Sequence, residues 1–93
     1  MIVYLLHFNK LVSGKQHYIG CTYNLLRRLE QHRNYEYASK LCKEAVKNNI
    51  SFTLGKTWNG GYKLEQKIKR DGHAERYCII CNPPLTDKGF NPL

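Results

Sequence analysis

The first part of the chain has short apolar runs on either side of a turn signal, which is the pattern of a β-hairpin. Residues 1–8 are β-branched, aromatic and aliphatic, and they predict a buried strand. Ser13-Gly14-Lys15 favours a turn, and a second short apolar run follows at residues 17–21. We therefore expect the chain to begin with two paired strands.

Helical spacing follows the hairpin. Three leucines share one face of a helix expected over residues 24–33, with its cap among residues 22–24. Ser39 is placed to cap a second helix near residues 40–48.

The rest of the pattern completes a small mixed fold. Residues 50–58 alternate apolar and polar and predict a third strand, and residues 61–71 predict a third helix. Residues 74–82 predict a short last helix or an irregular segment. The order hairpin, helix, helix, strand, helix gives an α/β (α+β) composition in which helices must cover a small sheet.

Length and composition fit one globular domain. The chain has 93 residues, of which 42% are hydrophobic and 24% are charged. We assign residues 1–82 to the domain and residues 83–93 to a C-terminal arm. No signal peptide is recognised and no segment is long enough to span a bilayer, so we expect an intracellular protein with reduced thiols.

The charge points to a polyanionic partner. Fifteen Lys and Arg against seven Asp and Glu give a net charge of +8 and a pI of about 9.5. Nucleic acid is the commonest such partner, and the chain has no basic amphipathic helix that would favour a membrane surface instead. We expect the following residues to track phosphates: Arg27, Arg33, Lys40, Lys43 and Lys67.

One carboxylate stands among cations on the third predicted helix. Glu65 is surrounded by lysines and Arg70, so it stays ionised at neutral pH. One carboxylate, phosphate oxygens and waters are an ordinary way to hold Mg²⁺. The alternative is an i,i+4 ion pair from Glu65 to Lys69.

Two further pairs of residues suit phosphate chemistry. Arg28 and His32 are one helical turn apart, and Arg offers a planar fork that matches phosphate. The alternative is a solvent-facing basic stripe. Tyr4 and Tyr18 lie in the two strands of the hairpin, where cross-strand packing is the alternative role.

Together these residues resemble the motifs of the GIY-YIG nuclease family, over about residues 2–82. The resemblance rests on Val3-Tyr4, Tyr18-Ile19-Gly20, Asn24-Leu25-x-x-Arg28-x-x-x-His32 and Glu65 in Leu-Glu-x-x-Ile-Lys. The first motif lacks its glycine. The resemblance implies a three-stranded antiparallel sheet flanked by three or more helices, and single-metal hydrolysis of DNA with Mg²⁺ or Mn²⁺.

The resemblance also implies a role for each residue. Glu65 would be the metal ligand, and Arg28 would bind the scissile phosphate and stabilise the transition state. Tyr4 and Tyr18 would line the site, and one of them would help to deprotonate or orient the attacking water. His32 would assist the phosphate or that tyrosine.

The remaining expectations concern two residue positions, Gly20 and Asn82, and the partners of the protein. Gly20 would serve backbone geometry, close phosphate approach or packing, and the resemblance implies that Asn82 would be the counterpart of the family's late Asn. We expect a structure-selective or weakly sequence-specific endonuclease, a monomer or a homodimer, and the sequence does not separate DNA from RNA. The alternative is a non-catalytic nucleic-acid-binding domain that retains the fold.

The cysteines raise a separate question. Cys78-Ile-Ile-Cys81 is a C-x-x-C pair, and a structural zinc site needs four ligands. His73 and Cys42 would complete one if the fold brought them together. The alternatives are buried thiols that close the core or a redox pair.

Overall fold

The first two strands form a hairpin closed by a two-residue turn. In the computed structural model, which describes residues 1–83, β1 (Ile2–Val12) pairs antiparallel with β2 (Lys15–Thr22). Ser13 and Gly14 have φ values of 50° and 78°. Positive φ at both central residues is what a type I′ hairpin turn requires. The predicted hairpin is therefore confirmed, although β1 continues past the predicted residue 8, because ladder hydrogen bonds do not need apolar side chains.

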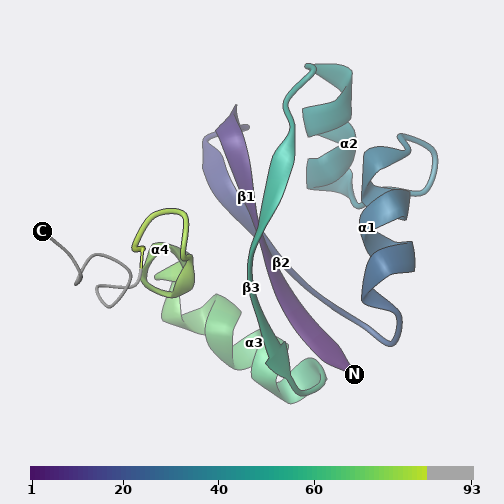
Figure 1. Cartoon of the computed structure of the whole chain (residues 1–93). Helices are drawn as coiled ribbons and strands as arrows, with labels where there is room; N and C mark the ends of the chain where they lie inside the picture. Colours follow the sequence, from purple (N-terminus) through teal and green to yellow (C-terminus); the bar gives the residue numbers. More distant parts are fainter. Residues whose placement is uncertain (84–93) are drawn as a thin grey trace, which may run out of the picture.

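The third strand completes the sheet on the other side of β1. β3 (Phe52–Asn59) pairs antiparallel with β1, so the strand order is β2-β1-β3 and β1 is central (Figure 1). The expected three-stranded antiparallel sheet is confirmed. Because β2 is an edge strand, one side of it is open to the groove described below.

Helices cover both faces of this sheet. α1 (Leu25–Arg33) and α2 (Lys40–Lys47) lie on one face, and α3 (Tyr62–Asp71) and α4 (Ala74–Tyr77) lie on the other (Figure 1). The bounds of the first three helices agree closely with the sequence prediction. The segment after α3 is a single helical turn followed by a turn over residues 79–81.

The helices begin and end at residues that satisfy their free backbone groups. The Asn24 side chain accepts a hydrogen bond from the backbone of Arg27, and the Ser39 side chain accepts one from Cys42. Gly72, with φ 67°, ends α3 in the left-handed region that glycine adopts without strain.

Successive side chains of β1 point to opposite faces of the sheet, and this divides the core in two. Tyr4, Leu6 and Phe8 pack with α1 and α2, whereas Val3 and Leu5 pack with α3 and the start of the turn after α4. All five side chains are almost fully buried. Each side chain of β1 therefore lies either on the α1–α2 side of the sheet or on the α3–α4 side.

Two remaining expectations concern the ends of the chain and the membrane. Of the C-terminal arm expected at residues 83–93, only Pro83 belongs to the described residues. Within residues 1–83, every helix falls short of the length and apolar character that a membrane crossing requires.

Candidate functional site

A buried hydrogen bond joins the central strand to α1. The hydroxyl oxygen of Tyr4 lies 2.7 Å from Nε2 of His32, and both side chains are buried. The backbone N–H of Ser39 donates to Nδ1 of His32 at 3.3 Å. Because Nδ1 accepts this hydrogen bond, it carries no proton. In the neutral ring the proton is therefore on Nε2, and the Nε2–H donates to the Tyr4 oxygen. In this arrangement the Tyr4 hydroxyl oxygen is the acceptor, and its own O–H does not donate to His32.

Burial keeps both partners of this bond neutral. Desolvation raises the pKa of Tyr4 well above its usual value, Tyr18 raises it further, and the Arg28 guanidinium lowers it in part. Desolvation and then the charge of Arg28 lower the pKa of His32 to about 4. Without a bound cation or phosphate, the pair therefore supplies a phenol donor held in place by a neutral imidazole.

Tyr18 and Arg28 complete a cluster on this face of the sheet. The ring of Tyr18 is 6.2 Å from that of Tyr4 and 5.2 Å from that of His32, centroid to centroid. Nη1 of Arg28 donates to Gln31 Oε1 at 3.0 Å and to the Tyr37 carbonyl at 3.1 Å, which fixes the guanidinium where its charge acts on Tyr4 and His32. Four of the five predicted catalytic residues thus lie together.

Gly20 makes room for this cluster. It is the β2 partner of Tyr4, and a Cβ at this position would lie 2.4 Å from the Tyr4 hydroxyl oxygen and 2.5 Å from its Cζ. Side-chain carbons do not approach this closely. Of the roles expected for Gly20, packing is the one that the contacts show.

Glu65 lies on the opposite face of the sheet. It is 8% exposed on α3, and its Oε2 lies 3.3 Å from Nζ of Lys69, so the i,i+4 ion pair is present. Burial raises the pKa of the Cys21 thiol and the charge of Glu65 raises it further, which puts the carboxylate near the end of β2. No hydrogen bond or ion pair among residues 1–83 joins Glu65 to the four clustered residues.

A groove at the edge of β2 connects the two faces. It has a volume of about 1010 Å³ and is lined by β2, by α2 and by the α3–α4 segment. Tyr18 and Lys40 line it from the cluster side, and Lys69, the ion-pair partner of Glu65, lines it from the other side. A ligand lying over this edge would meet groups from both faces.

The expected phosphate-tracking residues are divided between the faces. Arg27 and Lys40 are exposed at the start of α1 and α2, while the guanidinium of Arg33 lies 4.6 Å over the Phe52 ring. Nζ of Lys43 lies 5.6 Å over the Tyr35 ring. Lys67 is exposed on α3, so it belongs to the other face.

Asn82 also lies on the α3–α4 side. Its side-chain amide donates to the Glu75 carbonyl, and its backbone N–H donates to the Cys78 carbonyl at 2.9 Å. These bonds place Asn82 in the turn after α4 rather than in the tyrosine cluster.

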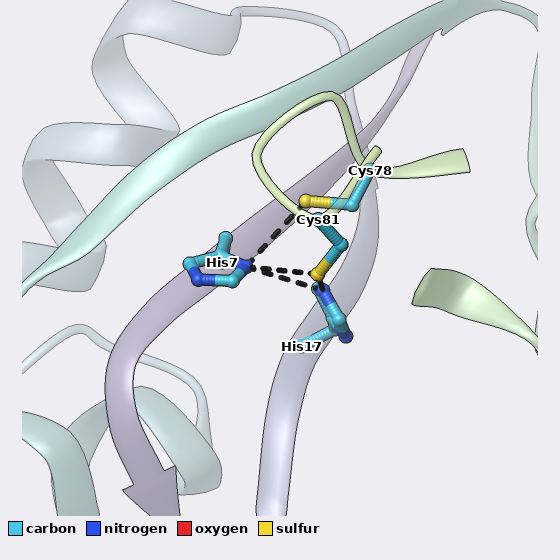
Figure 2. Close-up of side chains that lie close together, drawn as sticks. All are labelled: His7, His17, Cys78 and Cys81. Atoms are coloured by element: carbon cyan, nitrogen blue, oxygen red, sulfur yellow. Dashed lines mark hydrogen bonds between the residues drawn. The ribbon is translucent and has the colours of Figure 1, made fainter. Parts of the chain in front are cut away.

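A second cluster contains the two cysteines that the sequence marks as candidate metal ligands, together with two histidines that it does not. His7 and His17 from the hairpin meet Cys78 and Cys81 from the turn after α4, and the four donor atoms lie within 4.8 Å of one another (Figure 2). The expectation that His73 and Cys42 complete a site with the cysteines is wrong.

Their positions explain this. Cys42 is buried in the core between the sheet and α1–α2, on the face opposite Cys78. Nδ1 of His73 lies 3.5 Å from Oε2 of Glu75. The signal that could have found the correct histidines is the hairpin register, which pairs His7 with His17 across the strands.

Comparison of the chain with family models, curated proteins and solved structures gave no match. The interpretation of both clusters therefore depends on their residues and geometry.

Proposed function

We propose that this protein is a metal-dependent endonuclease that hydrolyses phosphodiester bonds of DNA. The observation that carries the proposal is the cluster of two phenols, an imidazole and a guanidinium at Tyr4, Tyr18, His32 and Arg28. Burying a tyrosine hydroxyl and a histidine together is costly unless each has a partner, and the fold provides those partners.

Each member has a role in the proposal. Arg28, fixed by two hydrogen bonds, stabilises charge on the phosphate oxygens. Tyr4 is almost fully buried and does not line the groove, so its part is to position the neighbouring Arg28 and Tyr18 from beneath. Tyr18 is half-buried and lines the groove, so it is the phenol that meets a water there. His32 holds Tyr4 in position.

Glu65 is the residue that would hold Mg²⁺ or Mn²⁺ in this proposal. The donor fits chemically, because an ionised carboxylate is a hard oxygen ligand and one carboxylate suffices when phosphate and water complete the shell. The bound metal would polarise the phosphate and stabilise the leaving oxygen. Its place near the end of β2 requires that the substrate backbone lies over the edge of that strand.

The expected partner follows from charge and site. A net charge of +8 suits a polyanion, and contacts from lysines such as Lys40 give affinity without reading the base sequence. We therefore propose a structure-selective or weakly specific enzyme. The four cysteines are free, in keeping with a reducing, intracellular compartment.

One observation favours a second candidate function, a nucleic-acid-binding domain without activity. Glu65 is ion-paired to Lys69 on the face opposite the cluster. If the pair is permanent, the carboxylate is not available to a metal.

The test is a cleavage assay on labelled branched, linear and single-stranded DNA and on RNA, with Mg²⁺, Mn²⁺ or a chelator. We expect Arg28→Ala and Glu65→Gln each to lower the cleavage rate by about 100-fold or more, the usual effect of removing a transition-state contact. DNA affinity should stay close to that of the wild type.

The matched controls are an arginine and a glutamate outside the cluster and the groove. Arg76→Ala and Glu30→Gln change exposed residues and should cleave at a rate near that of the wild type. Wild-type cleavage by both site variants would place the active site elsewhere. Tight DNA binding with no cleavage in any metal would favour the binding domain.

A further inference from the structure

We propose that His7, His17, Cys78 and Cys81 form a structural zinc site that ties the hairpin to the end of the domain. The two histidines are adjacent across β1 and β2, and the two cysteines flank the turn after α4 (Figure 2). The proposal does not rest on the nuclease proposal, because none of the four residues takes part in the chemistry proposed above.

The spacing of the donor atoms matches a zinc tetrahedron. With Zn–N bonds of about 2.0–2.1 Å and Zn–S bonds of about 2.3 Å, tetrahedral edges are about 3.3 Å for N–N and about 3.5 Å for N–S. Nδ1 of His7 lies 3.3 Å from Nε2 of His17. The N–S distances are 3.5 Å to Cys78, and 3.6 and 3.4 Å to Cys81. Four of the six edges therefore have the lengths that the ion would impose.

The donor set selects the metal and its role. Two thiolates and two imidazoles suit zinc, whereas Mg²⁺ prefers oxygen ligands and would not bind here. Four protein ligands close the coordination sphere, which leaves no position for a substrate or a reactive water. The cluster therefore has the composition of a structural site.

Neighbouring residues of β3 hold the turn that carries the cysteines in position. A Cβ at Gly55 of β3 would lie 3.0 Å from Sγ of Cys78, so glycine makes room for the thiol. The Ile79 N–H donates to the Gly55 carbonyl at 3.2 Å and fixes the turn against the strand. Ile79 and Ile80 are 47% and 43% exposed, whereas Cys78 is fully buried. Apolar burial alone would favour the isoleucines, so the turn is arranged to bury the Cys78 thiol, while Cys81 lies at the surface beside the two histidines.

The ion would connect parts of the chain that are far apart in sequence. Cys78 and His7 are separated by 71 positions, and Cys81 and His17 by 64. His17 also lines the groove at the edge of β2, together with Ala74 and Glu75 of α4. Zinc would hold that wall of the groove to the sheet, where α4 itself is a single helical turn without a fully buried residue.

The direct test is the metal content of protein purified under reducing conditions without chelator or a polyhistidine tag. We expect close to one zinc ion per chain, retained against a chromophoric chelator. Cys81→Ser and His17→Gln should lose the ion at a chelator concentration that leaves the wild type loaded. These positions are preferred to Cys78, because its thiol is fully buried and its loss could unfold the chain.

The control variants are Cys21→Ser and His73→Gln, which change one residue of each type outside the cluster and should keep their zinc. Cobalt provides a second readout. The wild type should give the thiolate-to-cobalt charge-transfer absorption and the intense d–d bands of a tetrahedral site, and Cys81→Ser should lose part of the charge-transfer band. Chelation should lower the Tm of the wild type but not that of Cys81→Ser.

Three results would overturn the proposal. These are wild-type protein without zinc and with an octahedral cobalt spectrum, equal zinc retention in the two ligand variants, and a Cys78–Cys81 disulfide in freshly isolated protein. None of these measurements uses cleavage, so failure of the zinc site and failure of the nuclease proposal are distinguishable.

Discussion

The hydroxyl oxygen of Tyr4 and Nε2 of His32 lie 2.7 Å apart although the residues are 28 positions apart in sequence. The bond crosses the interface between the central strand and α1, and both side chains are buried there. The other imidazole nitrogen is occupied by the Ser39 backbone. The pair therefore fixes both the position of the phenol and the tautomer of the ring, and it can be tested one atom at a time.

Removing the Tyr4 hydroxyl should destabilise the fold. Tyr4→Phe keeps the ring but leaves the His32 Nε2–H without its acceptor, so we expect a loss of about 1–3 kcal/mol. Urea unfolding measures it. Tyr18→Phe is the control, because within residues 1–83 no protein hydrogen bond involves the Tyr18 hydroxyl. Equal unfolding free energies for the two variants would contradict the role given to this bond.

A side chain at Gly20 should disrupt the same cluster. Gly20→Ala would place a Cβ 2.4 Å from the Tyr4 hydroxyl oxygen, and relieving such an overlap in a packed core costs about 1–3 kcal/mol. Gly61→Ala is the matched control, since its nearest contact would be an ordinary 3.7 Å to the sulfur of Met1. Thermal unfolding should separate the two variants, and an unchanged Tm for Gly20→Ala would count against the packing role.

Acid should weaken the fold through His32. Its pKa is about 4 in the folded state and about 6.5 in the unfolded state, so the unfolded chain takes up this proton first as the pH falls. This contribution to stability is fully present above about pH 6.5 and is lost toward pH 4. The loss between pH 7 and pH 4.5 should be roughly 2–3 kcal/mol.

The same unfolding measurements on His32→Gln separate this proton from those of other groups that titrate in the same range. One such group is His17, because burial lowers its pKa as well. Denaturant unfolding at several pH values gives both curves. We expect the wild type to lose more stability than the variant over this range. Parallel curves would show that His32 is not held neutral by burial.

Binding to DNA should depend on salt and on the groove. The plot of log affinity against log salt should be steep, and Lys40→Ala should reduce its slope by about one, because one phosphate contact is lost. Lys10→Ala changes an exposed lysine that does not line the groove and should leave the slope unchanged. Fluorescence anisotropy at several salt concentrations measures both, and equal slopes for all three proteins would place the DNA elsewhere.

The sequence by itself determined the elements, because they depend on neighbouring residues. The Ser13-Gly14 turn and the caps at Asn24 and Ser39 act over a few positions, and each lies where the sequence pattern predicts it. The spacing of Arg28 and His32 likewise follows from helical geometry, so their place on one turn of α1 was predictable.

Only the tertiary structure decided which elements share a face and which side chains meet. Glu65 was grouped with the phenols by motif, but α3 covers the face opposite α1, and the alternation along β1 separates the two cores. His7 and Cys78 meet because strand register and helix packing bring distant segments together. Such contacts depend on long-range packing of the whole chain, which local sequence patterns do not encode.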